Sequence, residues 1–443
     1  EAGADMDYLI KSQSIGAFAT ATLGYRNYAY LVVGGRNSFT STLEAENRSV
    51  FYPNISGSFI ATEAFDFLRN KKNINYLKFR LGYSTAANFP SPYSTRSALN
   101  ISTRNFVTNS GTVINTNSIP NFLPNPNLKP ELMAETETGI EGKFFQSRLS
   151  ADITLYQRVS NDQILNRDLD PSTGYTSQQI NAGKVTNKGV EAQLAYKIIR
   201  NKDWVWEVTG NWTINNSMVS DIPADLKEIV YAGYTTLGNF AINGQPLGIM
   251  KGYYYQRHEN GQLLVGAGGD YIASTTIGII GNPNPNYRLS GINSLTYKSF
   301  TFRFQVDYTD GGDMYSSTAR SLLARGVTKD TEFDRAAPYI LPGVTADGKP
   351  NNIQISATQG YFNNVFGPDQ GGIFDATVVR LRDMSLSYAL PEKLLNKTPF
   401  GSVSITANGS NLWYYAPNFP KYMNFDPETN GLGVGNGRGL EFI

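Results

Sequence analysis

The sequence predicts an all-β protein, an antiparallel transmembrane β-barrel, of which this chain supplies about 12 strands. Three observations indicate this fold class. Stretches of about ten residues repeatedly alternate apolar and polar side chains, which is the pattern of a strand with two unlike faces. Short turns and long loops follow one another along the chain, as in barrels of this kind. Aromatic residues make up 12% of the sequence, which suits aromatic belts at the membrane surfaces.

Three strands show the alternation most clearly. In residues 148–156, Leu149, Ala151, Ile153 and Leu155 face one way, whereas Arg148, Ser150, Asp152, Thr154 and Tyr156 face the other. In residues 300–308, Phe300, Phe302, Phe304, Val306 and Tyr308 alternate with Thr301, Arg303, Gln305 and Asp307. A third strand carries Trp204, Trp206 and Trp212 on one face. Such an apolar face suits contact with lipid, and the polar face suits a barrel lumen.

The same pattern predicts each strand in order. We expect strands at 14–24, 28–35, 49–61 and 76–84, two strands within 125–157, and further strands at 189–196, 204–214, 288–297, 300–308, 378–390 and 401–413. Polar loops are expected at 36–48, 85–134, 160–187, 219–286 and 311–373, with a hairpin of its own around 249–256. Loops of that length are unusual inside a compact soluble domain but ordinary on the outer side of a barrel.

Composition excludes several other classes of protein. The 38 basic and 37 acidic residues balance, so no nucleic-acid partner is expected. Cysteine is absent, which excludes disulfides and thiolate chemistry. No apolar run approaches the ~18 residues of a membrane-spanning helix.

The order of turns and loops predicts that the chain is one part of a barrel. If the short turns face the periplasm, the first strand runs inward and the twelfth runs outward, so at least one strand is expected beyond each end. The first residues lack the basic and apolar regions of a signal peptide, which agrees with this expectation. The glycine-rich tail from Asn430 shows no following strand.

One strand departs from the pattern. Arg380 and Arg382 share their spacing with Met384, Leu386 and Tyr388, which should face lipid. Either a β-bulge switches the faces, or the two arginines lie at headgroup level above the hydrocarbon. We favour the second explanation, because both arginines sit at the strand end nearest a long loop.

Several motifs now carry a family resemblance. The segment 125–131 (NPNLKPE), followed by Glu137-Thr-Gly139, resembles the loop-to-strand motif of TonB-dependent outer-membrane receptors. Six further motifs are similar to the SusC/RagA branch of those receptors: 181–183 (NAG), 187–191 (NKGVE), 244–253 (GQPLGIMKGY), 281–286 (GNPNPN), 379–388 (VRLRDMSLSY) and 408–413 (NGSNLW). Their common order along the chain makes the resemblance specific.

The resemblance implies a barrel of about 22 strands with an N-terminal plug. Residues 1–443 would then be a partial barrel without the plug, the early strands and the last strand. It also implies import of large nutrients, glycans or oligopeptides, across the cell outer membrane. The implied partners are a SusD-like surface lipoprotein that acts as a lid, TonB acting through the plug, and outer-membrane lipid.

Two alternatives to import stay open. A structural or secretion-associated barrel would anchor envelope partners without importing nutrients, and the full-length protein would then lack a plug and a TonB-binding segment. A soluble β-sandwich lectin would be extracted without detergent, and it leaves the face with Trp204, Trp206 and Trp212 unexplained.

No catalytic site, metal site or cofactor is expected. His258 is the only histidine and falls in a loop, which excludes a histidine-based zinc site and a Ser-His-Asp triad. Five charged residues are expected to face the lumen or the plug: Asp152, Glu191, Glu207, Arg303 and Asp307. Loop aromatics are candidates for contact with a sugar or peptide: Tyr231, Tyr234, Phe240, Tyr361, Phe362 and Phe366. These rings could equally pack within the loops or against a lid.

Overall fold

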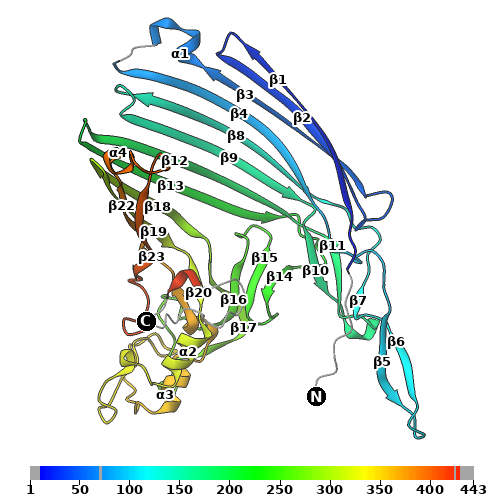
Figure 1. Cartoon of the computed structure of the whole chain (residues 1–443). Helices are drawn as coiled ribbons and strands as arrows, with labels where there is room; N and C mark the ends of the chain where they lie inside the picture. The colour runs from blue at the N-terminus through cyan, green and yellow to red at the C-terminus, as the bar shows by residue number, and fades with distance from the viewer. Residues whose placement is uncertain (1–9, 69–71, 424–425, 430–443) are drawn as a thin grey trace.

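A curved antiparallel sheet of 12 strands dominates the computed structural model, which describes residues 10–68, 72–423 and 426–429 (Figure 1). Its strands follow sequence order: β1 (Ser14–Tyr25), β2 (Ala29–Thr40), β3 (Ser49–Ile60), β4 (Ile74–Asn88), β8 (Glu131–Phe144), β9 (Leu149–Asn161), β12 (Lys184–Arg200), β13 (Trp204–Ser220), β18 (Pro285–Tyr297), β19 (Phe300–Gly311), β22 (Val378–Ala389) and β23 (Ser404–Tyr415). The 12 predicted strands are confirmed. The tail predicted to lack a strand lies outside the described residues.

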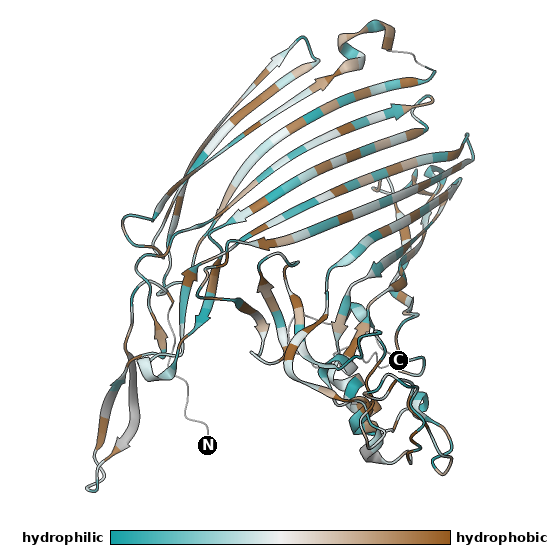
Figure 2. Ribbon diagram, turned by 180° about the vertical axis from the view of Figure 1, so that it is seen from behind, coloured by the Kyte–Doolittle hydropathy of each residue, from teal (hydrophilic) through white to brown (hydrophobic). Residues whose placement is uncertain are grey.

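The register sorts the side chains into two unlike faces. One row across the sheet joins Ile140, Ile153, Ala192, Trp212 and Leu289. The neighbouring row on the opposite face joins Glu141, Asp152, Gln193, Asn211 and Ser290. Figure 2 shows the resulting alternation of apolar and polar residues along the strands. We call these the outer and the inner face.

The outer face has no protein layer over it in the described part of the chain. Large apolar side chains there are solvent-exposed; Leu155 is 50% exposed, Leu194 50% and Leu386 52%. A water-soluble sheet would bury such a face against another layer. Lipid can take the place of that layer in a barrel, where every backbone group is paired within the sheet.

The two ends of the sheet differ in the length of their connections (Figure 1). Tight turns join several hairpins at one end. In the turn between β1 and β2, Arg26 and Asn27 adopt positive φ angles of 46° and 59°. The connections after β4, β9, β13 and β19 are long and lie at the other end. The predicted alternation of short turns and long loops is therefore confirmed. Two tight-end connections carry short helices, α1 (Ala61–Ala64) with η1 (Asp66–Leu68), and α4 (Glu392–Leu395).

The long loops contain folded units that the sequence did not predict. The hairpin expected at 249–256 is one strand, β16, of a four-stranded sheet. The strands of the loop sheets are β14 (Glu228–Gly233), β15 (Gly238–Ile242), β16 (Ile249–Tyr255) and β17 (Ala273–Gly281); β7 (Phe122–Leu123), β10 (Ile164–Asp168) and β11 (Ser177–Asn181); β5 (Asn100–Val107) with β6 (Val113–Ser118); and β20 (Asp313–Tyr315) with β21 (Ile373–Asp375). The loop helices are α2 (Ser317–Ala324), α3 (Gln359–Val365), η2 (Pro171–Thr173), η3 (Lys329–Thr331), η4 (Asp369–Gly372) and η5 (Pro427–Thr429). Among the described residues, no helix is long and apolar enough to cross a membrane.

Strand β22 corrects one prediction. The register with β19 pairs Gln305 with Asp383 and Val306 with Leu381, so Arg382 is an extra residue in a β-bulge. Arg380 consequently pairs with Asp307 and lies on the inner face. The placement of Arg380 and Arg382 at lipid headgroup level is therefore wrong, because the bulge brings both arginines to carboxylates inside the sheet.

The outer face contains one polar pair that should matter for stability. The indole Nε1 of Trp206 donates a hydrogen bond of 2.7 Å to Asn293 Oδ1. Asn293→Leu leaves this donor without an acceptor at an apolar surface, so we expect the free energy of unfolding to fall by about 1–3 kcal/mol. Thermal unfolding of the full-length protein in detergent measures the loss. Trp206→Phe combined with Asn293→Leu should recover most of the lost stability, because no donor is then left unpaired. An Asn293→Leu variant as stable as the wild type would contradict this role of the hydrogen bond.

Candidate functional site

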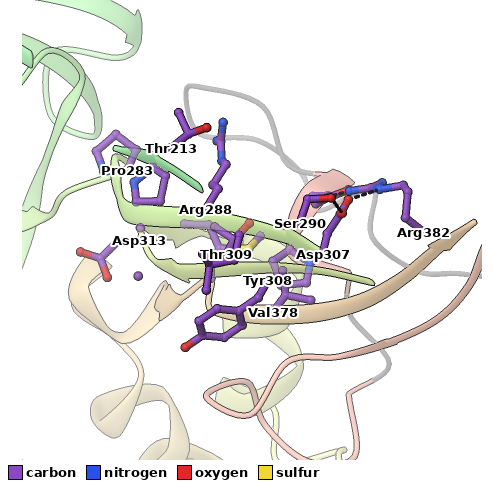
Figure 3. A pocket seen from close by; sticks show the side chains of 18 of the residues that line it. Thr213, Pro283, Arg288, Ser290, Asp307, Tyr308, Thr309, Asp313, Val378 and Arg382 are labelled. Atoms are coloured by element: carbon purple, nitrogen blue, oxygen red, sulfur yellow. Dashed lines mark hydrogen bonds and ion pairs between the residues drawn. The ribbon is translucent and has the colours of Figure 1, made fainter. Parts of the chain in front are cut away.

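A cavity of about 740 Å³ lies where the inner face of the sheet meets the long loops (Figure 3). The sheet contributes residues of β13, β18, β19 and β22, and the loops contribute residues of β15, β16, β20 and η5. Its polar lining includes Asn211, Thr213, Arg288, Ser290, Gln305, Asp307, Asp313, Arg382 and Glu428. A cavity of this size is within the range of sites for small organic ligands.

An ion-pair network forms one wall of the cavity. Asp307 Oδ2 lies 2.8 Å from Arg382 Nε, and Asp307 Oδ1 accepts hydrogen bonds from Ser290 and Gln305. Figure 3 draws the contact between Asp307 and Arg382 as dashed lines. Arg382 also lies 2.5 Å from Glu428, which follows β23 in the chain. The network therefore ties a segment distant in sequence to the inner face of the sheet.

Arg380 extends the network into a buried position. Its side chain is 2% exposed and its guanidinium contacts the carboxylate of Asp426, which is also buried. The guanidinium also lies over the ring of Tyr414, 5.4 Å from the ring centre. A charge buried this deeply is tolerated only when it is paired. This pair holds the segment before η5 against β22.

Two other charged groups of the cavity have no oppositely charged partner among the described residues. Arg288 on β18 is exposed and forms no ion pair there. Asp313 on β20 accepts a hydrogen bond of 2.7 Å from the backbone N–H of Asn282 but meets no cation. Burial, with a smaller contribution from the Asp375 carboxylate, raises the pKa of Asp313. Within the described part of the chain, the cavity thus presents one unpaired cation and one unpaired carboxyl group.

The structure places all five predicted lumen charges on the inner face. Asp152 pairs with Arg80 at 2.5 Å, and Glu207 lies 3.6 Å from Lys197. Glu191 and Arg303 form no ion pair with any described residue. Asp307 alone of the five lines the cavity. The role of these residues toward a plug or substrate stays a prediction.

The predicted loop aromatics differ in the ring surface they leave available. Phe240, Tyr361 and Phe362 are buried in the cores of loop units, 1%, 7% and 3% exposed. Phe366 packs against the cluster that contains Tyr361 and Phe362. These four rings pack mainly within their loops. Tyr234 is exposed and lines a second cavity of about 560 Å³ between β10 and β14, so substrate contact stays a prediction for it. Tyr231 lies in β14, but its side chain is outside the described part of the structure.

Sequence reasoning missed most charged residues of the cavity. Arg288 alternates in phase with Ser290 and could have been assigned to the inner face, but it stands at the end of its predicted strand. Asp313 and Glu428 lie in loops without a period, so no pattern marks them. His258 lies in a loop turn, where its Nδ1 accepts from the backbone N–H of Asn260 at 3.3 Å. Within the described residues there is no cluster of three or more metal-binding side chains.

These features define the class of protein. An antiparallel sheet with an apolar outer face, a charged inner face and long loops at one end is part of the wall of an outer-membrane β-barrel. The chain belongs to the family described as "TonB dependent receptor-like, beta-barrel", whose model matches residues 2–412. It is therefore part of the β-barrel of an outer-membrane receptor of this family.

Curated relatives support this membership. The chain is similar to TonB-dependent receptor P26 of Formosa agariphila, with 25% identity over 97% of this chain and 44% of the relative. It is also similar to TonB-dependent receptor SusC of Bacteroides thetaiotaomicron, with 25% identity over 41% of this chain and 20% of SusC. The chain thus spans less than half the length of these relatives.

Solved structures show the same fold. A structure described as the RagAB peptide transporter superposes with a TM-score of 0.73, at 20% identity, over 96% of this chain and 46% of that chain. A RagAB peptide importer in the "open-open" state gives the same TM-score at 18% identity, over 97% of this chain and 45% of that chain. The SusC/RagA resemblance of the sequence motifs is thereby confirmed.

Proposed function

We propose that this chain forms much of the wall of a TonB-dependent importer of large nutrients, glycans or oligopeptides. A SusD-like surface lipoprotein would cover the long loops as a lid, and TonB would act on a plug inside the barrel. The observation that carries the proposal is the cavity of about 740 Å³, because it opens on the inner face at the loop end, where a nutrient would arrive. A scaffold barrel would not need a partly charged cavity at that place.

The likeness to RagAB supports the finer part of the proposal. Those structures are described as a peptide transporter and a peptide importer. The likeness extends over nearly the whole of this chain. The long loops that carry their own sheets provide a broad surface at the same end for a lid protein.

Blocking the cavity tests the proposal. Ser290 lies on the inner face within the cavity, and Ser294, on the same face of β18, lies outside it. In a strain without the gene, we expect Ser290→Trp to abolish uptake-dependent growth on peptide or polysaccharide mixtures, whereas the wild type and Ser294→Trp restore it. Immunoblots of outer membranes control for abundance. Equal growth of the deletion strain and the wild type on every nutrient mixture would contradict import.

A further inference from the structure

The charged groups of the cavity fall into two sets. In the first set, Arg382 forms ion pairs with both Asp307 and Glu428, and Glu428 also lies 3.3 Å from Arg380. Arg288 and Asp313 have no such partner among the described residues, although both line the same cavity. Each charge of the first set already has an oppositely charged partner, so the charged groups left to pair with a ligand are Arg288 and Asp313.

The two unpaired groups come from different sides of the cavity. Arg288 lies on the sheet, where it pairs with Thr213 of β13 and Thr309 of β19 in register. Asp313 lies on β20, a loop strand that pairs with β21. Figure 3 shows the Arg288 side chain extending from β18 toward Thr213. A ligand that fills the cavity would therefore meet a cation on the barrel wall and a carboxylate on the loop.

We propose that Arg288 and Asp313 form a subsite for zwitterionic oligopeptides. Arg288 would bind a carboxylate of the peptide, since a guanidinium can donate two parallel hydrogen bonds to a carboxylate. Asp313 would bind an ammonium group of the same peptide. This inference rests on the proposed import function and names its substrate class.

The charges favour peptides over glycans on physical grounds. A neutral glycan offers hydroxyl groups and leaves both charges unpaired in a partly enclosed cavity, which costs free energy. An acidic glycan supplies the anion for Arg288 but no cation for Asp313. Among the described residues that line the cavity, only Tyr308 is aromatic, so these residues offer little ring surface for stacking on a sugar.

Titration calorimetry on the full-length transporter in detergent tests the subsite with pentaalanine as the probe. Amidation of its C-terminus and Arg288→Gln should each weaken binding about tenfold to a hundredfold, the value of one charge-assisted hydrogen bond. The two changes together should cost little more than either alone, because they remove the same contact. N-terminal acetylation and Asp313→Asn should show the same relation.

Two unpaired inner-face residues outside the cavity provide matched controls. Arg303→Gln and Glu191→Gln remove the same charges from the same face of the sheet, and neither residue lines the cavity. Both should leave the affinity for pentaalanine unchanged. The blocked peptides test the wild type directly, so the inference stays testable if a cavity variant fails to fold.

Three results would overturn the inference. One is binding of maltoheptaose that Arg288→Gln and Asp313→Asn leave unchanged, with no binding of pentaalanine. Another is binding of oligogalacturonate that needs Arg288 but not Asp313, which would assign the site to acidic glycans. The third is equal binding of free and blocked pentaalanine. In each of these the import function stands, whereas loss of import itself would appear in the growth experiment.

Discussion

Replacement of Arg380 by methionine is expected to lower the free energy of unfolding by about 3–5 kcal/mol. The Arg380 guanidinium contacts Asp426, and both side chains are buried, 2% and 3% exposed. Methionine fills a similar volume but leaves the carboxylate of Asp426 without its counter-charge. The loss is measured as the change in urea-induced unfolding of the full-length transporter in detergent, read by tryptophan fluorescence.

A second substitution separates the ion pair from simple packing. Arg380→Met combined with Asp426→Leu removes both charges, and an apolar replacement of a whole buried pair is often neutral or stabilising. Most of the lost stability should therefore return. Arg303→Met is the matched control, because Arg303 lies on the same face and has no ion pair among the described residues. A cost at Arg380 no greater than at Arg303 would refute the assignment.

Leu194→Arg is expected to destabilise the protein by about 2–4 kcal/mol in a bilayer, the cost of an arginine on the lipid face near the membrane centre. Leu194 is 50% exposed in the structure and pairs with Ala151 and Gly210 on the outer face of the sheet. It lies well inside β12, away from both strand ends. Folding into lipid vesicles at a series of urea concentrations gives the free-energy difference.

The neighbouring residue supplies the control for this prediction. Gln193→Arg places the same side chain one position earlier, on the inner face, where Gln193 pairs with Asp152 and Asn211. Its cost should be small, because a charge there remains in a polar lumen. Equal costs at the two positions would show that the Leu194 face does not contact lipid.

The sheet could be predicted from the sequence because the alternation of apolar and polar residues within each strand reflects the different surroundings of its two faces. Phe302 and Arg303 face lipid and lumen in turn, so a period of two residues marks the strand and both its faces. The order of strands followed as well, because each pairs with the strands before and after it in the sheet. Strand ends were predicted less accurately. The structure extends β12 from Lys184 to Arg200, whereas the predicted strand covered only 189–196, because the residues on either side of that range carry no regular alternation.

The loops and the cavity depend on contacts that no local pattern records. Val219, at the end of β13, packs with Ile229 and Ala241 of the four-stranded loop sheet, and none of these shows a helical or strand period strong enough to predict that core. The cavity joins Arg288 to Asp313 and Glu428, which come from a strand and from two separate loops. Arg382 was misplaced because one extra residue in β22 changes which side chains share a face.

That extra residue has a consequence for comparisons between homologous chains. In β22, odd-numbered positions from Asp383 to Ser387 line the lumen, whereas nearer the loops the even-numbered Arg380 does so. If a relative lacks the extra residue and is aligned without a gap at Arg382, lipid-contacting and water-contacting positions appear exchanged over part of this strand. Deleting Arg382 itself would restore regular alternation and leave Arg380 and Asp383 on the inner face, because Arg382 is the residue outside the register. Homology transfer along β22 therefore needs the hydrogen-bond register as well as the alignment.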